Sequence, residues 1–191
     1  METQYKVNNK LIELVQGSIT RYSADALVCP ANADLEMVAF PGGVQFAFLR
    51  EGGEQIFRES SKLRKKYGGA VEETSAHLTN AGNLPAKYVI HSVAVGYKEG
   101  KGLYVDTEII RKSTKNALDL ANEKKLKSIG FPAFGTGLYN APLDDVVNDM
   151  GEEFISHLKN QTSLERIGLV LYSSDQYILG KKELDGKFNS K

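Results

Sequence analysis

The chain has 191 residues, with 24 basic and 24 acidic side chains, so its formal net charge at pH 7 is zero when histidine is neutral. This length fits one domain, because single hydrophobic cores grow to roughly 250 residues. Because the charges balance, the protein has no net positive charge that would attract it to nucleic acid or to an anionic membrane. Any anionic ligand must be held by local groups.

Cysteine usage and hydropathy indicate the cellular compartment. Cys29 is the single cysteine, so the chain forms no internal disulfide. The first ten residues lack the apolar core of a signal peptide, and no apolar run approaches the roughly 20 residues that a membrane span needs. We therefore expect a soluble cytoplasmic protein without membrane contact.

Short β-rich runs alternate with longer segments of helical period. The predicted strands are rich in Val, Ile, Leu or Tyr and cover residues 11–16, 25–31, 75–81, 87–95, 127–134 and 165–173. The predicted helices cover residues 45–67, 106–125 and 142–159. Asp106 is suited to cap the second helix, and Pro142 is suited to the first turn of the third.

Several predicted strands are apolar nearly throughout, which is expected when helices cover both faces of a largely parallel sheet. We therefore predict an α/β fold, a three-layer α/β/α sandwich formed by residues 1–191 as a single domain. The last residues, from about 180 to 191, are polar and are expected to form a tail or a frayed helix.

Two glycine-rich loops precede predicted helices, FPGGVQ at residues 40–45 and GTGLYN at residues 135–140. In open α/β sheets, ligands bind at the carboxyl ends of strands, where helix amino ends expose unpaired N–H groups. Glycines there let phosphate oxygens approach the backbone donors. One such loop is more often a plain turn. Two together predict that each loop binds one phosphate of a diphosphate.

The common nucleotide motifs do not fit these loops. GTGLYN lacks the third glycine of GxGxxG, and the chain contains no GxxxxGK[ST] sequence. A dinucleotide-dependent dehydrogenase or a P-loop NTPase is therefore not expected.

In chain order, VQGSIT, DALVCPAN, PGGV, LTNAGNLPAKYVIHSV, FPAFGTGLYNAP and GLVLYSSD resemble blocks of the macrodomain family. The resemblance runs from about Leu11 to Asp175. It implies a three-layer α/β/α sandwich with a central mixed sheet, and ADP-ribose, free or attached to protein, as the usual ligand. Some members hydrolyse ADP-ribosyl esters or related metabolites, whereas others only bind.

The resemblance assigns candidate ligand-binding residues by position. The first diphosphate loop corresponds to Gly42, Gly43 and Val44, and the second to Gly135, Thr136, Gly137, Leu138 and Tyr139. Asn32 matches an asparagine that hydrogen-bonds the distal ribose, and it is a catalytic candidate only if the chain is hydrolytic. Without the resemblance, Asn32 would be a residue that closes a turn.

The adenine end of the expected site involves two further segments. Tyr172 matches an aromatic position that packs against adenine, although without the resemblance it would be assigned to the core. Ser18 and Ile19 fall in a block where many members have an acidic residue that accepts a hydrogen bond from the adenine amino group. Ser18 has no charge, so this bond should contribute about 1 kcal/mol less.

Two more departures concern the catalytic end of the expected site. Cys29 replaces the first asparagine of a segment that is NAAN-like in the family, and Gln45 stands where hydrolytic relatives commonly have an acid. Gln45 cannot act as a general base. We therefore favour a protein that binds ADP-ribose. The alternative is a hydrolase that removes ADP-ribose from modified proteins or deacetylates O-acetyl-ADP-ribose.

The cysteine, the histidines and two aspartates could also be read as catalytic residues, but each has a simpler structural role. Cys29 with His77 or His91 could form a thiol nucleophile and base, but a buried cysteine and a hydrogen-bonded structural histidine are favoured. Asp144 and Asp145 are expected to stabilise a helix amino end.

Cofactors and partners follow from the same residues. No histidines or carboxylates show metal-site spacing, so we expect neither a structural metal nor a cofactor. The expected partners are ADP-ribose or an ADP-ribosylated protein. Basic residues interleaved with aromatics are lacking, so no broad nucleic-acid surface is expected.

Overall fold

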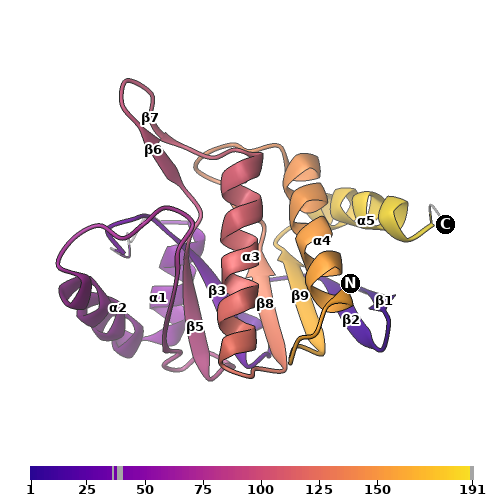
Figure 1. Cartoon of the computed structure of the whole chain (residues 1–191), viewed down its shortest axis with the longest axis horizontal. Coiled ribbons are helices and arrows are strands. Elements are labelled where there is room, and N and C mark those ends of the chain that lie inside the picture. Colours follow the sequence, from indigo (N-terminus) through magenta and orange to yellow (C-terminus); the bar gives the residue numbers. More distant parts are fainter. Residues whose placement is uncertain (36, 38–40, 190–191) are drawn as a thin grey trace.

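The computed structural model describes residues 1–35, 37 and 41–189. It is built around a seven-stranded sheet with the strand order β1-β2-β9-β8-β3-β5-β4 (Figure 1). The strands are β1 Glu2–Val7, β2 Lys10–Gln16, β3 Ala26–Ala31, β4 Ala76–Asn80, β5 Tyr88–Val93, β8 Ser128–Pro132 and β9 Arg166–Leu171. From β2 to β5 neighbouring strands are parallel, whereas the edge strands β1 and β4 pair antiparallel. The sheet is therefore mixed.

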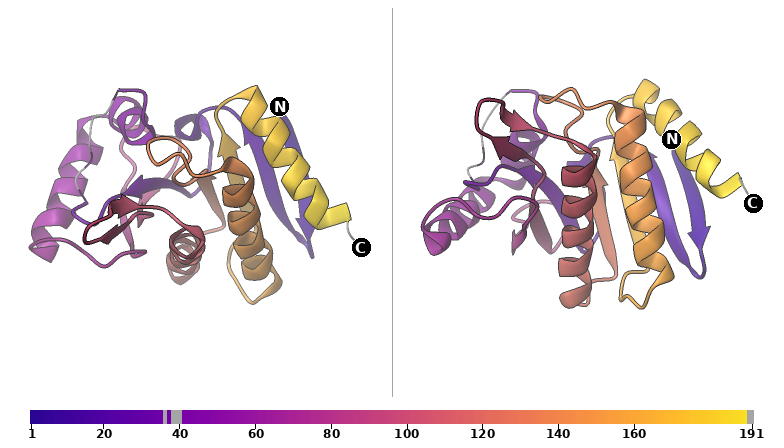
Figure 2. Two further views of the ribbon diagram at one scale, coloured as in Figure 1. Left: turned by 90° about the horizontal axis from the view of Figure 1, so that it is seen from above. Right: turned by 45° about the horizontal axis from the view of Figure 1, so that its top comes forward.

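Helices form the two outer layers (Figures 1 and 2). They are α1 Val44–Gly52, α2 Glu54–Tyr67, α3 Thr107–Glu123, α4 Leu143–Lys159 and α5 Ser174–Asn189, with a short 3-10 turn at Ile19–Arg21. One core cluster joins the sheet to α3, α4 and α5, and a second joins its other face to α1 and α2. The predicted three-layer α/β/α sandwich is confirmed.

The apolar runs of the central strands arise because both faces of the sheet are covered. In β3, Ala26 and Val28 belong to the core under α3 and α4, while Leu27 and Cys29 belong to the core under α1 and α2. Successive side chains of a strand point to opposite faces, so a strand buried on both sides must be apolar at every position.

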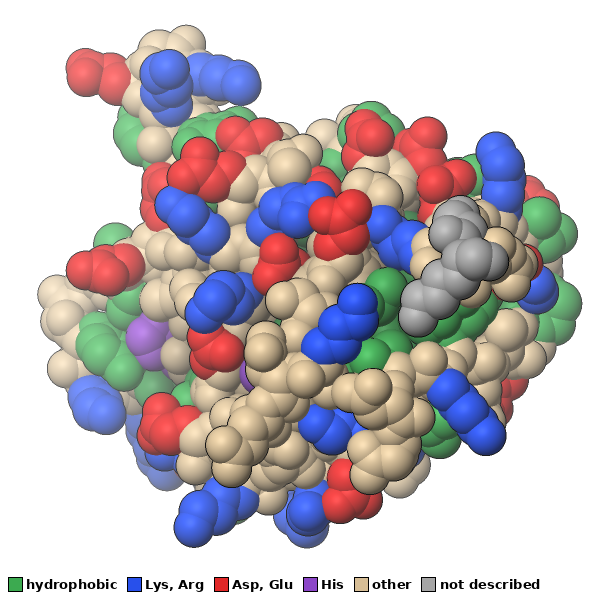
Figure 3. Space-filling model, turned by 45° about the vertical axis from the view of Figure 1, so that its right-hand side comes forward, with side chains coloured by type: hydrophobic (Ala, Val, Ile, Leu, Met, Phe, Trp, Pro, Cys, Tyr) green, Lys and Arg blue, Asp and Glu red, His purple; other side chains and the backbone are tan. Residues whose placement is uncertain are grey.

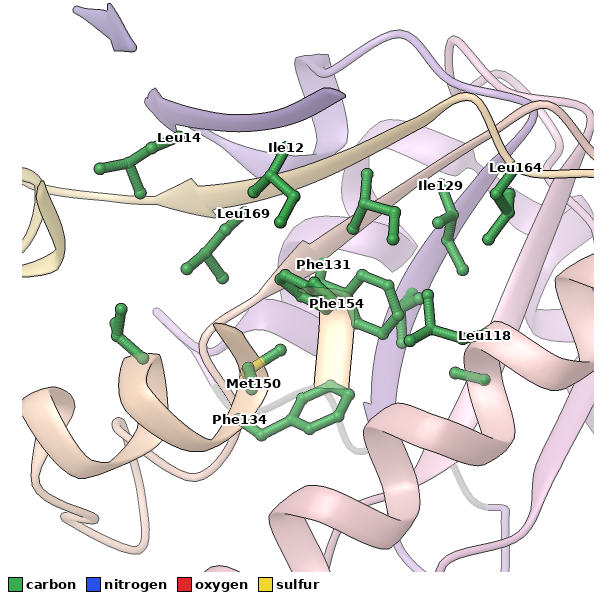
Figure 4. Packing of buried hydrophobic residues seen from close by; sticks show 14 of the residues in the cluster. Ile12, Leu14, Leu118, Ile129, Phe131, Phe134, Met150, Phe154, Leu164 and Leu169 are labelled. Atoms are coloured by element: carbon green, nitrogen blue, oxygen red, sulfur yellow. The ribbon is translucent and has the colours of Figure 1, made fainter. Parts of the chain in front are cut away.

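Aromatic side chains occupy the centre of the core beneath α4 (Figure 4). Phe131 of β8 lies 5.0 Å from Phe154 of α4 and 6.0 Å from Phe134, measured between ring centroids. All three are fully buried. This packing anchors the loop that follows β8 at its first residues.

The start of α3 agrees with the prediction, whereas the start of α4 differs from it by one residue. The Asp106 carboxylate accepts a hydrogen bond of 2.9 Å from the Ile109 main-chain N–H, so its predicted capping role is confirmed. Pro142 precedes the first residue of α4 and occupies the N-cap position, one residue earlier than predicted.

The single helix predicted over residues 45–67 is wrong, because the segment forms two helices, α1 and α2. Gly53 lies between them with a φ of 78°. A positive φ interrupts a right-handed helix and favours glycine. A Cβ on Gly53 would also lie only 2.9 Å from Asn83 Nδ2.

Several elements were not predicted. Edge strand β1 alternates polar and apolar residues, with Tyr5 and Val7 buried. A hairpin of β6 Gly96–Lys98 and β7 Gly102–Tyr104 projects from the body (Figure 1). The residues from 180 to 189, expected to be a tail or a frayed helix, form the second half of α5, whose Leu184 is fully buried.

Charged side chains are mixed over the face shown in Figure 3, where basic and acidic groups alternate without a broad field of one sign. This arrangement agrees with the balanced composition. In the described ranges, none of the helices combines the length and apolar character that crossing a bilayer would require.

Candidate functional site

A cavity of about 570 Å³ opens at the carboxyl ends of β2, β9, β8 and β3. These strands are parallel neighbours, so the loops that follow them meet at one edge of the sheet. β3 leads to α1 on one face of the sheet, whereas β8 leads to α4 on the other. Because the segments after β3 and β8 run to opposite faces of the sheet, a crevice opens between the two loops.

The pairing of β3 with β8 shows where this crevice begins. Their register ends at Leu27 and Gly130, although β3 continues to Ala31 and β8 to Pro132. Beyond the last pair, the two strands no longer share a ladder. Ala31 and Pro132 both line the cavity, which therefore opens where the strands separate.

All of the predicted site residues line this single cavity. They are Ser18, Ile19, Asn32, Gly42, Gly43, Val44, Gly135, Thr136, Gly137, Leu138, Tyr139 and Tyr172. The fold thus brings together segments that follow four different strands. Their roles in ligand binding remain predictions.

The loop between β8 and α4 is held by its own hydrogen bonds. Thr136 Oγ1 donates to the Ala133 carbonyl over 3.2 Å, and the Ala141 N–H donates to the Gly135 carbonyl over 3.1 Å. Within the described part of the chain, none of the main-chain N–H groups of residues 135–139 donates to a protein acceptor. The loop therefore presents a row of free donors at the cavity.

The second set of donors comes from the start of α1. This helix begins at Val44, with Gly43 in the N-cap position and Gly42 at a φ of 88°. The first N–H groups of a helix have no helical acceptor, and the helix dipole adds partial positive charge there. Phe40, which belongs to the predicted loop, lies outside the described residues.

The glycines of the two loops differ in how much space a side chain would have at their positions. A Cβ added to Gly42 or Gly137 would meet no atom within 4 Å. A Cβ on Gly135 would lie 2.8 Å from Val105 Cγ1, and the φ of 70° is itself unfavourable for other residues. Gly135 is thus required by the fold, whereas Gly137 leaves space.

Asn32 follows β3 and has an unusual side-chain environment. Its Oδ1 atom is buried, and no hydrogen-bond partner reaches it from the described residues. A buried acceptor without a partner costs about 1–3 kcal/mol. Such an atom at a cavity wall is suited to accept a hydrogen bond from a ligand hydroxyl.

The adenine end suggested by the sequence lies beside β2 and β9. Tyr172 is 79 % exposed, so the core assignment that it would have without the family resemblance does not hold. Ser18 Oγ lies 2.7 Å from Thr20 Oγ1, and the two hydroxyls share a hydrogen bond. Tyr139 is half-buried, and this burial raises the pKa of its hydroxyl.

Leu103 and Gln176 are among the residues of the cavity wall that the sequence did not indicate. Leu103 comes from the hairpin strand β7, whose short segment has little local signal. Gln176 could have been found, because Ser173 and Gln176 have the spacing of a capping box at the start of a helix. Gln45 was noted only for lacking a carboxylate, yet it also lines the cavity.

The structure does not support a thiol nucleophile at Cys29, the alternative that the sequence disfavoured. Cys29 is 1 % exposed, and burial raises the pKa of its thiol well above the usual range, so it stays protonated. His91 is buried with its Nε2 2.9 Å from Thr79 Oγ1, and burial lowers its pKa to about 4. Neither side chain is part of the cavity wall formed by the described residues. Cys29 and His91 therefore have the structural roles that the sequence favoured.

The cavity wall is electrically neutral: among the described residues that form it, none carries a formal charge. Asp144 and Asp145 lie in the first turn of α4, as expected for carboxylates that stabilise a helix amino end. The described ranges contain no cluster of three or more His, Cys, Asp or Glu side chains able to hold a metal ion.

Fold and cavity together define a three-layer α/β/α domain with a ligand-sized cavity at the carboxyl edge of its sheet. The chain belongs to the macro domain family, whose model matches residues 28–150. The O-acetyl-ADP-ribose deacetylase 1 of Pantoea vagans is 32 % identical over 177 residues, which cover 92 % of this chain and 99 % of that protein.

Two solved structures show how closely the fold is shared. The Oceanobacillus iheyensis macrodomain with ADP superimposes with a TM-score of 0.88 at 23 % identity, covering 100 % of this chain and 98 % of that one. The Trypanosoma brucei macrodomain in complex with ADP-ribose gives a TM-score of 0.72 at 27 % identity, covering 90 % and 68 %. Because the Oceanobacillus iheyensis structure is only 23 % identical to this chain, its similarity shows a shared fold.

Proposed function

We propose that the chain binds ADP-ribose, either free or attached to a modified protein. The order of the strands supports this ligand: residues that follow β2 and β9 would hold adenine, the loop after β8 would hold the diphosphate, and Asn32 after β3 would hold the distal ribose. Neighbouring strands thus offer subsites in the order in which the ligand's parts are joined.

The observation that carries the proposal is the row of free main-chain N–H groups at residues 135–139, in the same cavity as the first turn of α1. Converging amides and a helix amino end bind phosphate oxygens without a charged side chain. The neutral wall is therefore compatible with a dianionic diphosphate. The ligands named for the two macrodomain structures, ADP and ADP-ribose, support the same assignment.

Isothermal titration calorimetry with ADP-ribose, ADP and AMP tests the proposal. We expect ADP-ribose to bind most tightly, ADP more weakly because it lacks the distal ribose, and AMP weakest because it cannot span both loops. Absence of binding for all three ligands, or equal affinity for AMP and ADP-ribose, would contradict the proposal.

Hydrolysis of an ADP-ribosyl ester is the second candidate function. The unpaired Oδ1 of Asn32 favours it, because a buried acceptor can hold the distal ribose in one orientation. The deacetylase named in Pantoea vagans also favours it. The described wall contains no carboxylate or histidine, so a water molecule would have to be activated by position and by the ligand's own phosphate.

Incubation with O-acetyl-ADP-ribose and with a mono-ADP-ribosylated protein separates the two functions. Release of acetate or ADP-ribose that disappears in an Asn32→Ala variant would establish hydrolysis. The same variant should still bind ADP-ribose, because the diphosphate donors are unchanged. Binding without turnover in the unmodified chain would leave recognition as the function.

The partner and location remain part of the proposal. If an ADP-ribosylated protein is the partner, only its terminal ADP-ribosyl group needs to enter the cavity. A cytoplasmic location, which the single cysteine favours, can be tested by fractionation.

A further inference from the structure

The end of the cavity beside β2 and β9 is suited to a flat base. Gln16 and Leu171 are register partners, and the Gly17 N–H donates to the Leu171 carbonyl over 2.9 Å, so Ser18 and Tyr172 begin adjacent loops. Tyr172 is 79 % exposed and lines the cavity. An exposed aromatic face at a cavity wall offers a stacking surface.

Gln176 supplies the amide at this end, and its orientation is determined by a capping box. Its N–H donates to Ser173 Oγ over 3.2 Å, while its Oε1 accepts from the N–H groups of Tyr172 at 3.0 Å and Ser173 at 3.3 Å. Two donors occupy both lone pairs of Oε1. The exchanged assignment of the amide would place NH₂ against two N–H donors, so it is excluded.

What remains available on Gln176 is its NH₂ group. In the part of the chain that the structure describes, Nε2 donates to no acceptor, and the residue lines the cavity. Ser18 Oγ, which also lines the cavity, shares a hydrogen bond with Thr20 Oγ1 and keeps a lone pair that can accept, without the charge that a carboxylate would bring. No carboxylate is present among the described wall residues. The group that Gln176 itself offers to a base is therefore a donor.

Purine bases differ in what their edges offer to such donors. Adenine presents an acceptor at N7 beside an amino donor at C6, whereas a 6-oxopurine presents two adjacent acceptors, N7 and O6. Glutamine normally reads adenine with its oxygen and its nitrogen together. At Gln176 the oxygen is occupied, so only the donor half of this pairing remains.

We propose that Gln176 reads the purine C6 substituent, and that the cavity binds diphosphoribosides of 6-oxopurines, hypoxanthine or guanine, at least as tightly as ADP-ribose. The inference rests on the proposed function, because it assumes that a nucleoside diphosphoribose occupies the cavity. It adds which base the chain prefers and which residue makes the choice.

Calorimetry with ADP-ribose, inosine 5′-diphosphoribose and guanosine 5′-diphosphoribose tests the preference. We expect the inosine ligand to bind with a Kd equal to or below that of ADP-ribose. The guanosine ligand shows whether the additional amino group at C2 is accepted, and thus which 6-oxopurine fits. A lower Kd for ADP-ribose than for both others would overturn the inference while leaving the proposed function intact. If none of the ligands binds, both fail.

The variant Gln176→Glu tests the residue itself. Glutamate retains the capping box, because one carboxylate oxygen still accepts from Ser173 N–H. The other oxygen replaces the NH₂ donor with an acceptor that suits the adenine amino group. We expect the ratio of the inosine to the adenine Kd to rise by about tenfold.

Ser174→Asp is the matched control for the added charge. Ser174 adjoins the same capping box but does not belong to the described cavity wall, so this variant should weaken both ligands equally. An unchanged ratio in Gln176→Glu, with thermal unfolding that shows an intact fold, would remove Gln176 from base recognition. If the variant does not fold, the comparison of ligands on the unmodified chain still decides the inference.

Discussion

The Gln45 side-chain amide donates a hydrogen bond of 2.7 Å to the main-chain carbonyl of Pro30. This bond ties the first turn of α1 to the end of β3, two residues before Asn32. Both partners line the cavity. Gln45, which in the sequence stands out only as the loss of a carboxylate, thus links the loop proposed to bind the diphosphate to the segment proposed to bind the distal ribose.

Replacing this amide gives the first prediction. In Gln45→Glu the ionised carboxylate cannot donate to the Pro30 carbonyl and adds negative charge beside the diphosphate, so ADP-ribose should bind about tenfold or more weakly at pH 7.5. Acidification that protonates the new carboxyl restores a donor, so affinity should recover at lower pH. Calorimetry across pH measures both effects.

Arg50→Gln is the control for Gln45→Glu. It changes the net charge by the same amount on the same helix, and Arg50 is an exposed residue outside the described cavity wall. Its affinity should stay within about twofold of the unmodified chain. Equal losses in the two variants would mean that charge alone, and not the link to Pro30, sets affinity.

Gly137→Val should separate binding from folding. The added side chain meets no protein atom within 4 Å at its Cβ, so the melting temperature should change little, but the side chain occupies space over the loop donors. We expect ADP-ribose affinity to fall by at least tenfold. Gly186→Val, which also has open space around its Cβ, is the control for bulk. Unchanged binding in Gly137→Val would remove this loop from the site.

Salt dependence should be shallow, because the described cavity wall carries no charged side chain. A ligand held by amides releases few counterions from the protein, so the slope of log Kd against log salt should be below about 1. Titrations between low and physiological salt measure it. A slope of several would instead indicate phosphate tracking over a charged surface.

Acid should destabilise the fold through His91. Its folded pKa of about 4 lies below the ordinary value of 6.5, so the unfolded chain binds the proton first as the pH falls. Stability is fully present above about pH 6.5 and is lost toward pH 4, by about 3 kcal/mol. Urea unfolding at several pH values should show a smaller loss in His91→Gln. Identical pH profiles would contradict this role.

Local patterns predicted most of the sheet and the two glycine loops. Strands such as β3 and β9 are apolar at successive positions because both faces are buried, and that signal is readable from a few residues. β1 and the β6–β7 hairpin lacked it, since edge and projecting strands expose one or both faces. The break at Gly53 was missed because helical periodicity continues on both sides of it.

The sequence by itself determined that this chain forms alternating strands and helices and that bare main-chain donors follow β3 and β8, because period, capping and glycine placement are local properties. Only the tertiary structure decided that the ends of β2, β9, β8 and β3 share one cavity, that Tyr172 is exposed, and that the Gln176 oxygen is already occupied. These features depend on register and hydrogen bonds between distant segments, which no local pattern specifies.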